Sequence, residues 1–159
     1  MFKEMRRLDR ETTPEKAMEI LDGAQYGFLS TIGENGYPYA VAVNHVMVDG
    51  KICFHCAAGV GAKIKNINAN PKVCFSVAQD IEVLQQVLST SFESAVAFGI
   101  ACEVTGESKM KVLEKLVEKF APEFAGALAY ISKHAGSTGI YAIEIERITG
   151  KVRSKKQDE

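Results

Sequence analysis

The chain has 159 residues, a length typical of one compact domain, and 19 basic against 20 acidic side chains give it a formal charge of -1. Apolar residues make up 47% of the chain, as in ordinary globular proteins, which excludes a largely disordered chain. The balanced charge offers no broad basic field for nucleic acid, and no apolar run is long enough to span a bilayer, so we expect a cytoplasmic protein that binds neither nucleic acid nor membrane.

The first expected element is a helix that begins at Pro14, with Thr13 as its N-cap. Apolar residues then recur at helical spacing, namely Ala17, Ile20, Leu21 and Ala24. At the other end of the chain, the sequence KVRSKKQDE is almost entirely polar and predicts a flexible tail over residues 151–159. We therefore expect a single domain over residues 1–150.

Strand-like patterns follow the first helix. Residues 26–32 and 37–48 form a predicted hairpin through residues 33–36, whose Asn-Gly step readily accepts positive φ angles. The Asp-Gly pair at residues 49–50 then predicts a tight turn into a third strand over residues 51–56. Three consecutive antiparallel strands are expected.

A short helix is predicted after the glycines at positions 59 and 61, and it should end at Asn70, which precedes a proline. Strand character returns over residues 72–78. A longer apolar strand is predicted over residues 92–105.

Ser108 is the predicted cap of a further helix that ends before Pro122, and residues 139–148 supply the last strand. One stripe of this helix is apolar and reads as a core face, comprising Met110, Leu113, Leu116, Val117 and Phe120. Six strands with short turns predict a mainly β fold with peripheral helices, arranged as a closed or nearly closed antiparallel barrel. Because residues 39–48 are apolar on both faces, a second subunit is expected to cover the outside of that strand.

The segment FHCAAGVGAK, residues 54–63, leaves a strand, crosses a loop of small residues and enters a helix. Lys63 would lie in the first turn, where unpaired N–H groups and the helix dipole favour an anion such as phosphate. The alternative is a glycine-rich connection with a solvated lysine. Ile64 stands where a nucleoside triphosphate loop would carry Ser or Thr, so that class of site is excluded.

Other candidate residues have structural alternatives. Cys53 and Cys56 have the spacing of zinc ligands, but nothing nearby completes four ligands, so we expect core thiols and no metal. His45 and His55 fall on strands and are either ligand-binding or hydrogen-bonded barrel residues. His134 is predicted to lie in a loop.

Several segments, taken with the FHCAAGVGAK loop, resemble the FMN-binding split barrel of the pyridoxamine 5'-phosphate oxidase-like superfamily, and in particular its nitroimidazole-resistance branch. The likeness spans nearly the whole chain. The segments that carry it are Met5-Arg6-Arg7 with Asp9-Arg10, Gly36-Tyr37-Pro38-Tyr39-Ala40-Val41, Asn70-Pro71-Lys72-Val73-Cys74-Phe75 and Ser94-Ala95-Val96-Ala97-Phe98-Gly99.

The resemblance implies a six-stranded antiparallel split β-barrel that holds FMN at the interface of a homodimer, with the phosphate on the Lys63 loop. The ring would lie against Ala42, Val43, Asn44 and His45, beside His55, Cys56 and Ala57. The partner subunit would contribute Ser91, Phe92 and Ser94. Two residues depart from the family pattern: Cys56 replaces a common Ser or Thr, and Glu93 replaces an Arg.

The same resemblance implies a flavin-dependent oxidoreductase that takes electrons from NAD(P)H or another donor and reduces a small aromatic or nitro acceptor. His55 is the candidate catalytic residue. The alternative is a non-catalytic module that stores or senses FMN or haem, with His45 or His55 as an axial ligand. The arginine-rich, C-terminal signature of true pyridoxamine phosphate oxidases is not recognisable.

Overall fold

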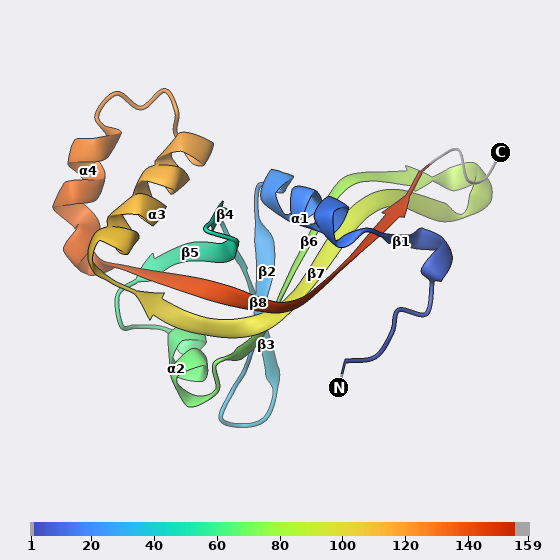
Figure 1. Cartoon of the computed structure of the whole chain (residues 1–159), viewed down its shortest axis with the longest axis horizontal. Helices are drawn as coiled ribbons and strands as arrows, with labels where there is room; N and C mark the ends of the chain where they lie inside the picture. Colours follow the sequence, from blue (N-terminus) through green and yellow to red (C-terminus); the bar gives the residue numbers. More distant parts are fainter. Residues whose placement is uncertain (1, 155–159) are drawn as a thin grey trace.

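The computed structural model describes residues 2–154, whose strands form one curled antiparallel sheet (Figure 1). The strand order is β3-β2-β6-β7-β8-β5-β4, with β1 beside β8. This confirms the predicted mainly β, split-barrel architecture, with eight strands rather than six. The strands are β1 (Glu11–Thr12), β2 (Gly27–Ile32), β3 (Pro38–Val43), β4 (His45–Val48), β5 (Lys51–Ala57), β6 (Lys72–Leu84), β7 (Ser89–Val104) and β8 (Thr138–Arg153).

The predicted strand over residues 37–48 is wrong in one respect, because it breaks at Asn44 into β3 and β4. β3 pairs with β2, whereas β4 pairs with β5, and these two pairs lie at opposite ends of the strand order. The sheet therefore curls until its two edge strands are joined by one residue. Asn44 is fixed there because its Nδ2 donates a hydrogen bond to the carbonyl of Gln25 at 3.1 Å.

The predicted turn at Asp49-Gly50 is confirmed between β4 and β5. The φ angles are 50° and 75°, both positive as a type I′ turn requires. The N-terminal helix α1 (Pro14–Gly23) is confirmed as well, because Thr13 Oγ1 accepts a hydrogen bond from the Lys16 N–H at 3.2 Å. Helix α2 (Ala62–Ala69) ends before Asn70 as expected.

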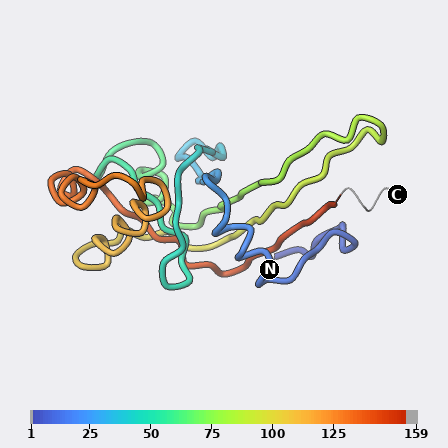
Figure 2. The backbone as a smooth tube through the Cα atoms, turned by 90° about the horizontal axis from the view of Figure 1, so that it is seen from above, coloured from blue at the N-terminus to red at the C-terminus, as the bar shows by residue number. Residues whose placement is uncertain are grey.

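Strand β6 extends past its predicted end at residue 78 and β7 begins at Ser89 rather than at residue 92, and the two form an arm that projects from the barrel (Figures 1 and 2). A β-bulge between Gln79 and Glu82, with Asp80 at a φ of 51°, lets the polar stretch there stay within the ladder. A short 3-10 turn, η2 (Gln85–Val87), closes the arm. Its outer surface exposes apolar side chains, namely Ile81, Val83, Val87 and Leu88.

The predicted helix that follows β7 exists as α3 (Gly106–Phe120), but it begins earlier than expected. Thr105 rather than Ser108 precedes its first turn. A further helix, α4 (Ala127–His134), was not predicted, so His134 lies in a helix and not in a loop. The remaining 3-10 turns are η1 (Leu8–Arg10) and η3 (Ala135–Ser137).

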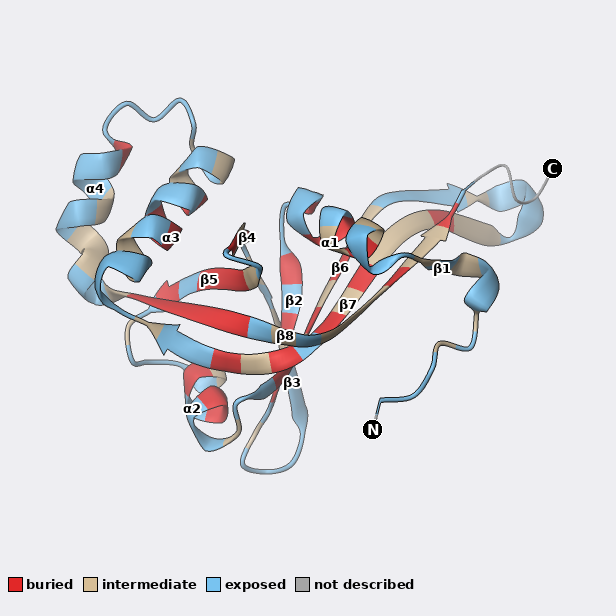
Figure 3. Ribbon diagram, in the orientation of Figure 1, coloured by how far each residue is buried: buried red, intermediate tan, exposed pale blue. Residues whose placement is uncertain are grey.

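Two apolar clusters hold the fold together, and buried residues follow the strands that form them (Figure 3). The larger fills the barrel and the contact with α1 and α2; its fully buried side chains include Leu29, Phe54 and Phe75. The smaller lies between α3 and the outer face of β4 and β5. Burial of these side chains, at roughly 1.5–3 kcal/mol each, is the main stabilising contribution.

The end of the chain is more ordered than the sequence predicts. The flexible tail was expected from Lys151, but β8 continues to Arg153, and Lys151 pairs with both Ser94 and Glu11. The rest of that predicted tail, residues 155–159, lies outside the described residues. Across residues 2–154, no helix combines the length and apolar character needed to traverse a bilayer.

Candidate functional site

The glycine-rich loop between β5 and α2 has open space beside it. Gly59 and Gly61 adopt φ angles of 67° and 97°, and a Cβ added at either would meet none of the described atoms within 4 Å. Gly61 precedes α2, so no side chain caps the first-turn N–H groups of that helix. A phosphate group could therefore approach these N–H groups closely, beside the half-buried Lys63.

His55 lies at the end of β5, directly before this loop. Partial burial lowers the pKa of His55, and the positive charge of Lys63 lowers it further. The neutral imidazole is therefore the form present at pH 7. The influence of Lys63 on His55 places the two predicted site residues in one electrostatic environment.

Cys56 is oriented differently from its neighbours His55 and Ala57. Its side chain belongs to the cluster inside the barrel, and its Sγ donates to the carbonyl of Gly139 at 3.7 Å. His55 and Ala57 are exposed on the opposite face of β5. The Cys56 thiol is thus a core group, and burial raises its pKa.

The spacing of Cys53 and Cys56 does not bring them together. Cys53 packs in the smaller cluster under α3, whereas Cys56 packs in the barrel, because residues three apart on a strand point to opposite faces. Both are free thiols in the structure. These two residues do not form a shared metal site.

Of the residues predicted to lie against the ring, Ala42, Val43 and Asn44 lie at the end of β3, where Ala42 and Asn44 are exposed. His45 does not lie with them. It is fully buried, its Nε2–H donates to the Leu21 carbonyl at 2.6 Å, and its ring packs edge-on against Phe75. His45 thus lies on the barrel side of the chain, as do Val43 and Met47.

The environment of His45 predicts a pH-dependent stability. Burial lowers the pKa of His45 below its ordinary 6.5, and Nδ1 has no hydrogen-bond partner among the described residues. The unfolded chain therefore takes up a proton more readily than the folded chain as pH falls below 6.5. The free energy of unfolding should fall by up to about 1.4 kcal/mol per pH unit there, as urea titrations at pH 7.5, 6.5 and 5.5 would measure.

The variant His45→Gln isolates this effect, because a glutamine amide can still donate to the Leu21 carbonyl. In this variant, the free energy of unfolding should fall less steeply as the pH is lowered, because the contribution of His45 is gone. His134→Gln, at a partly exposed position, should keep that contribution. Equal slopes in the wild type and His45→Gln would contradict the assignment.

The three residues predicted to come from a partner lie far from the loop within one chain. Phe92 pairs with Arg153 on β8, whereas His55 pairs with Ile140 at the other end of that strand. Thirteen positions separate Ile140 from Arg153, which corresponds to roughly 40 Å along a strand at about 3.3 Å per residue. Ser91, Phe92 and Ser94 therefore reach the loop only if a second copy presents them.

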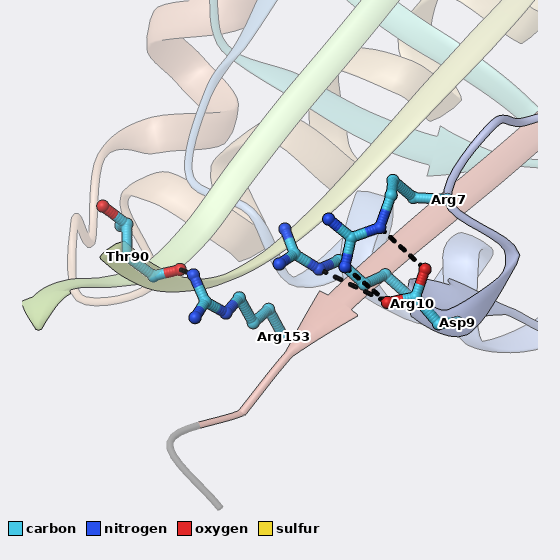
Figure 4. Close-up of polar contacts among 5 residues, drawn as sticks. All are labelled: Arg7, Asp9, Arg10, Thr90 and Arg153. Atoms are coloured by element: carbon cyan, nitrogen blue, oxygen red, sulfur yellow. Dashed lines mark hydrogen bonds and ion pairs between the residues drawn. The ribbon is translucent and has the colours of Figure 1, made fainter. Parts of the chain in front are cut away.

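Polar contacts surround this part of the arm (Figure 4). Arg153 Nη1 donates to the carbonyl of Thr90 at 3.4 Å. Arg7 and Arg10 both point toward Asp9; Arg7 Nε donates to Asp9 Oδ1 at 2.7 Å, and this pairing lowers the pKa of Asp9 to about 2. The first contact ties the end of β8 to the arm, whereas the others lie within the N-terminal segment.

Glu93, one of the two departures from the family pattern, has partners within its own chain. Its Oε2 accepts a hydrogen bond from Gln79 Nε2 at 3.1 Å, and its Oε1 lies 3.7 Å from Lys16 Nζ. The carboxylate charge is therefore balanced locally by a lysine of α1.

A pocket of about 280 Å³ lies between α3, α4 and the end of β5, and it includes two of the predicted site residues, Asn44 and His55. The sequence did not predict this pocket, because α4 was not recognised. The apolar stripe on this side of α3 predicts a core face. The structure instead leaves Val117 and Phe120 lining the pocket.

The sequence matches a known family. The family model described as pyridoxamine 5'-phosphate oxidase matches residues 13–152, most of the chain. The chain belongs to the pyridoxamine 5'-phosphate oxidase family. The resemblance inferred from the sequence is therefore confirmed, and this is a family whose barrel is associated with flavin binding.

Solved structures share the fold of this family member. A protein described as a 5-nitroimidazole antibiotic resistance protein, from Bacteroides thetaiotaomicron, is 21% identical with a TM-score of 0.71, over 88% of this chain and 84% of that one. A flavocytochrome from Azotobacter vinelandii is 19% identical with a TM-score of 0.78, over 95% and 72%. An FAD and haem binding protein from Mycobacterium smegmatis is 18% identical with a TM-score of 0.74, over 94% and 78%. No curated protein sequence matches the chain significantly.

Proposed function

We propose that this family member binds FMN between two copies of its barrel and reduces a small aromatic or nitro acceptor, with NAD(P)H or another compound as electron donor. The observation that carries the proposal is the open loop before α2. Two glycines with positive φ angles, an uncapped helix start and Lys63 meet there next to His55. This combination suits a phosphate attached to a flat ring system.

Each residue of the proposed site has a limited task. Lys63 and the first N–H groups of α2 would hold the phosphate, while the small side chains of Ala42 and Ala57 would let the ring approach the strands. His55, neutral at pH 7, would exchange hydrogen bonds with the ring edge or with the acceptor. The FMN itself would supply the hydride and electron transfer.

The distances within one chain support the proposed second copy. Figures 1 and 2 place the arm and the α3–α4 pair at opposite ends of the molecule. Strand β3 exposes Tyr39 and follows the exposed Tyr37, so an apolar edge is available for association. We therefore propose a two-fold dimer that covers β3 and in which the arm of one copy reaches the loop of the other.

Absorbance of the purified full-length protein tests the cofactor. Flavin bands at one FMN per chain, with a dimer by light scattering, are the expected result, and steady-state assays with NAD(P)H and a 5-nitroimidazole should then show flavin-dependent turnover. An intense haem band without flavin would support the non-catalytic alternative instead. His45 would not serve as the haem ligand, because its Nε2 is bonded to Leu21 and its ring is buried.

A further inference from the structure

We infer that the pocket between α3, α4 and β5 binds a flat, uncharged molecule of one or two rings that carries a hydrogen-bond donor. The inference deepens the proposed function, because it names the class of acceptor, but binding in this pocket does not itself require the flavin. The volume of about 280 Å³ lies near the lower end of the range of small-molecule sites, which limits the ligand to this size.

The walls of the pocket are apolar and incompletely covered. Leu113 and Leu116 form its buried base on α3. Three aromatic rings at its rim remain in contact with water, since Phe120, Phe124 and Tyr130 are 37%, 52% and 55% exposed. Rings that face an open cavity gain little from folding alone, and a flat ligand inserted among them would remove their apolar surface from water.

The segment that connects α3 to α4 keeps them as two separate helices. Residues 121–126 connect α3 to α4 and contain Pro122, which cannot continue the first helix. Figure 1 shows α3 and α4 side by side beyond the end of the sheet, and Figure 3 shows that their buried residues are few. The pair therefore forms an open-sided wall rather than a closed core.

Two polar side chains of the pocket, His134 and Asn44, offer acceptors to a ligand. His134 Nδ1 lies 2.8 Å from the Tyr130 carbonyl, and because a carbonyl only accepts, Nδ1 carries a proton; a ring with one proton then has Nε2 as its acceptor. Asn44 uses its Nδ2 on Gln25, so its Oδ1 is likewise an acceptor. None of the described residues that line the pocket is an Asp, Glu, Lys or Arg.

These features define what the ligand must supply. A hydroxyl or ring N–H would satisfy His134 Nε2 or Asn44 Oδ1, and a charged group would be buried without a counter-charge. Asn44 and His55 belong both to this pocket and to the predicted flavin position, so a ligand held here would lie next to the ring. The acceptor in the proposed reaction is thus expected to be an aromatic compound that carries a hydroxyl or ring N–H in addition to its reducible group, such as a nitro group.

Two probes test the inference directly: 2-naphthol, which has a donor, and 2-methoxynaphthalene, which lacks one. Calorimetric titration of the full-length protein, both as purified and after loading with FMN, should show 2-naphthol binding about 5- to 10-fold more tightly than its ether. Equal affinities for the two probes, or no binding of either, would overturn the inference.

Variants locate the binding. Val117→Trp should fill the pocket and weaken 2-naphthol at least tenfold, whereas Leu128→Ala, on an exposed face of α4 outside the pocket, should bind as the wild type does. His134→Phe keeps an aromatic ring beside Tyr130 but should remove most of the preference for 2-naphthol over the ether. If Val117→Trp does not fold, as circular dichroism would show, the probe ratio in His134→Phe decides, and an unchanged ratio overturns the role of His134.

The same samples separate this inference from the proposed function. Absorbance reports FMN, while calorimetry reports the naphthalene probes. A protein that binds 2-naphthol but takes up no FMN would support the pocket and contradict the flavin site. A protein that binds FMN but neither probe would support the flavin site and contradict the pocket.

Discussion

Replacing Lys63 with alanine should raise the dissociation constant for FMN by about 5- to 150-fold, which corresponds to the roughly 1–3 kcal/mol of a charge-assisted contact. Lys63 lies in the first turn of α2, half-buried, beside a loop with space for a phosphate. Without its ammonium group, only the N–H groups and the helix dipole would remain to hold the anion. Quenching of FMN fluorescence during titration measures the change.

The helix itself provides the matched control. Lys65→Ala removes the same charge from an exposed position two residues further along α2, and should change the affinity for FMN by less than about twofold. Lys63→Arg should retain most of the affinity, since it keeps the positive charge. Equal losses in Lys63→Ala and Lys65→Ala would show that the charge of α2, rather than a contact from Lys63, attracts the nucleotide.

The second large effect concerns the barrel wall. Gly99→Ala should lower the free energy of unfolding by about 2–4 kcal/mol, because the added Cβ would lie 2.1 Å from the carbonyl oxygen of Glu144 and 2.9 Å from Ile143 Cγ2. Gly99 sits where the ladder between β7 and β8 shifts register, so the backbone there cannot move without disturbing that ladder. Urea denaturation monitored by circular dichroism measures the loss.

Gly136→Ala is the appropriate comparison. A Cβ at Gly136 meets none of the described atoms within 4 Å, and its backbone φ is not positive, so stability should change by no more than about 0.5–1 kcal/mol. A similar loss in both variants would mean that the contact with Glu144 does not explain the cost at Gly99.

Sequence reasoning succeeded where the signal is local. The Thr13 cap and the Asp49-Gly50 turn each depend on a few adjacent residues, and both are present. The glycine loop with Lys63 was likewise found from one segment, because a strand, small residues and a helix start follow one another directly. The overall barrel followed from the number of strands and the short turns between them.

The errors arise where distant parts of the chain determine the outcome. The apolar pattern on both faces of residues 39–48 predicts one continuous strand. The break at Asn44 arises because β3 and β4 pair with two different strands. His45 lies inside the barrel, against Leu21 and Phe75, which is the hydrogen-bonded barrel position that the sequence left open beside a ligand-binding role.

The length of the arm and the presence of the helical pocket could not be predicted for related reasons. Polar residues at Gln79 and Asp80 suggested the end of a strand, whereas a bulge lets pairing continue to Leu84. Helix α4 has eight residues and too short an apolar pattern to stand out, and the function of its pocket depends on its position against α3.

The junction at Asn44 has a mechanical consequence. Neighbouring strands elsewhere in the wall are held by ladders of backbone hydrogen bonds, whereas β3 and β4 follow one another in the chain without pairing with each other. Moving these two edges apart therefore breaks no backbone ladder. Because Asn44 joins the two strands and also lines the helical pocket, the wall has an unpaired edge beside that pocket.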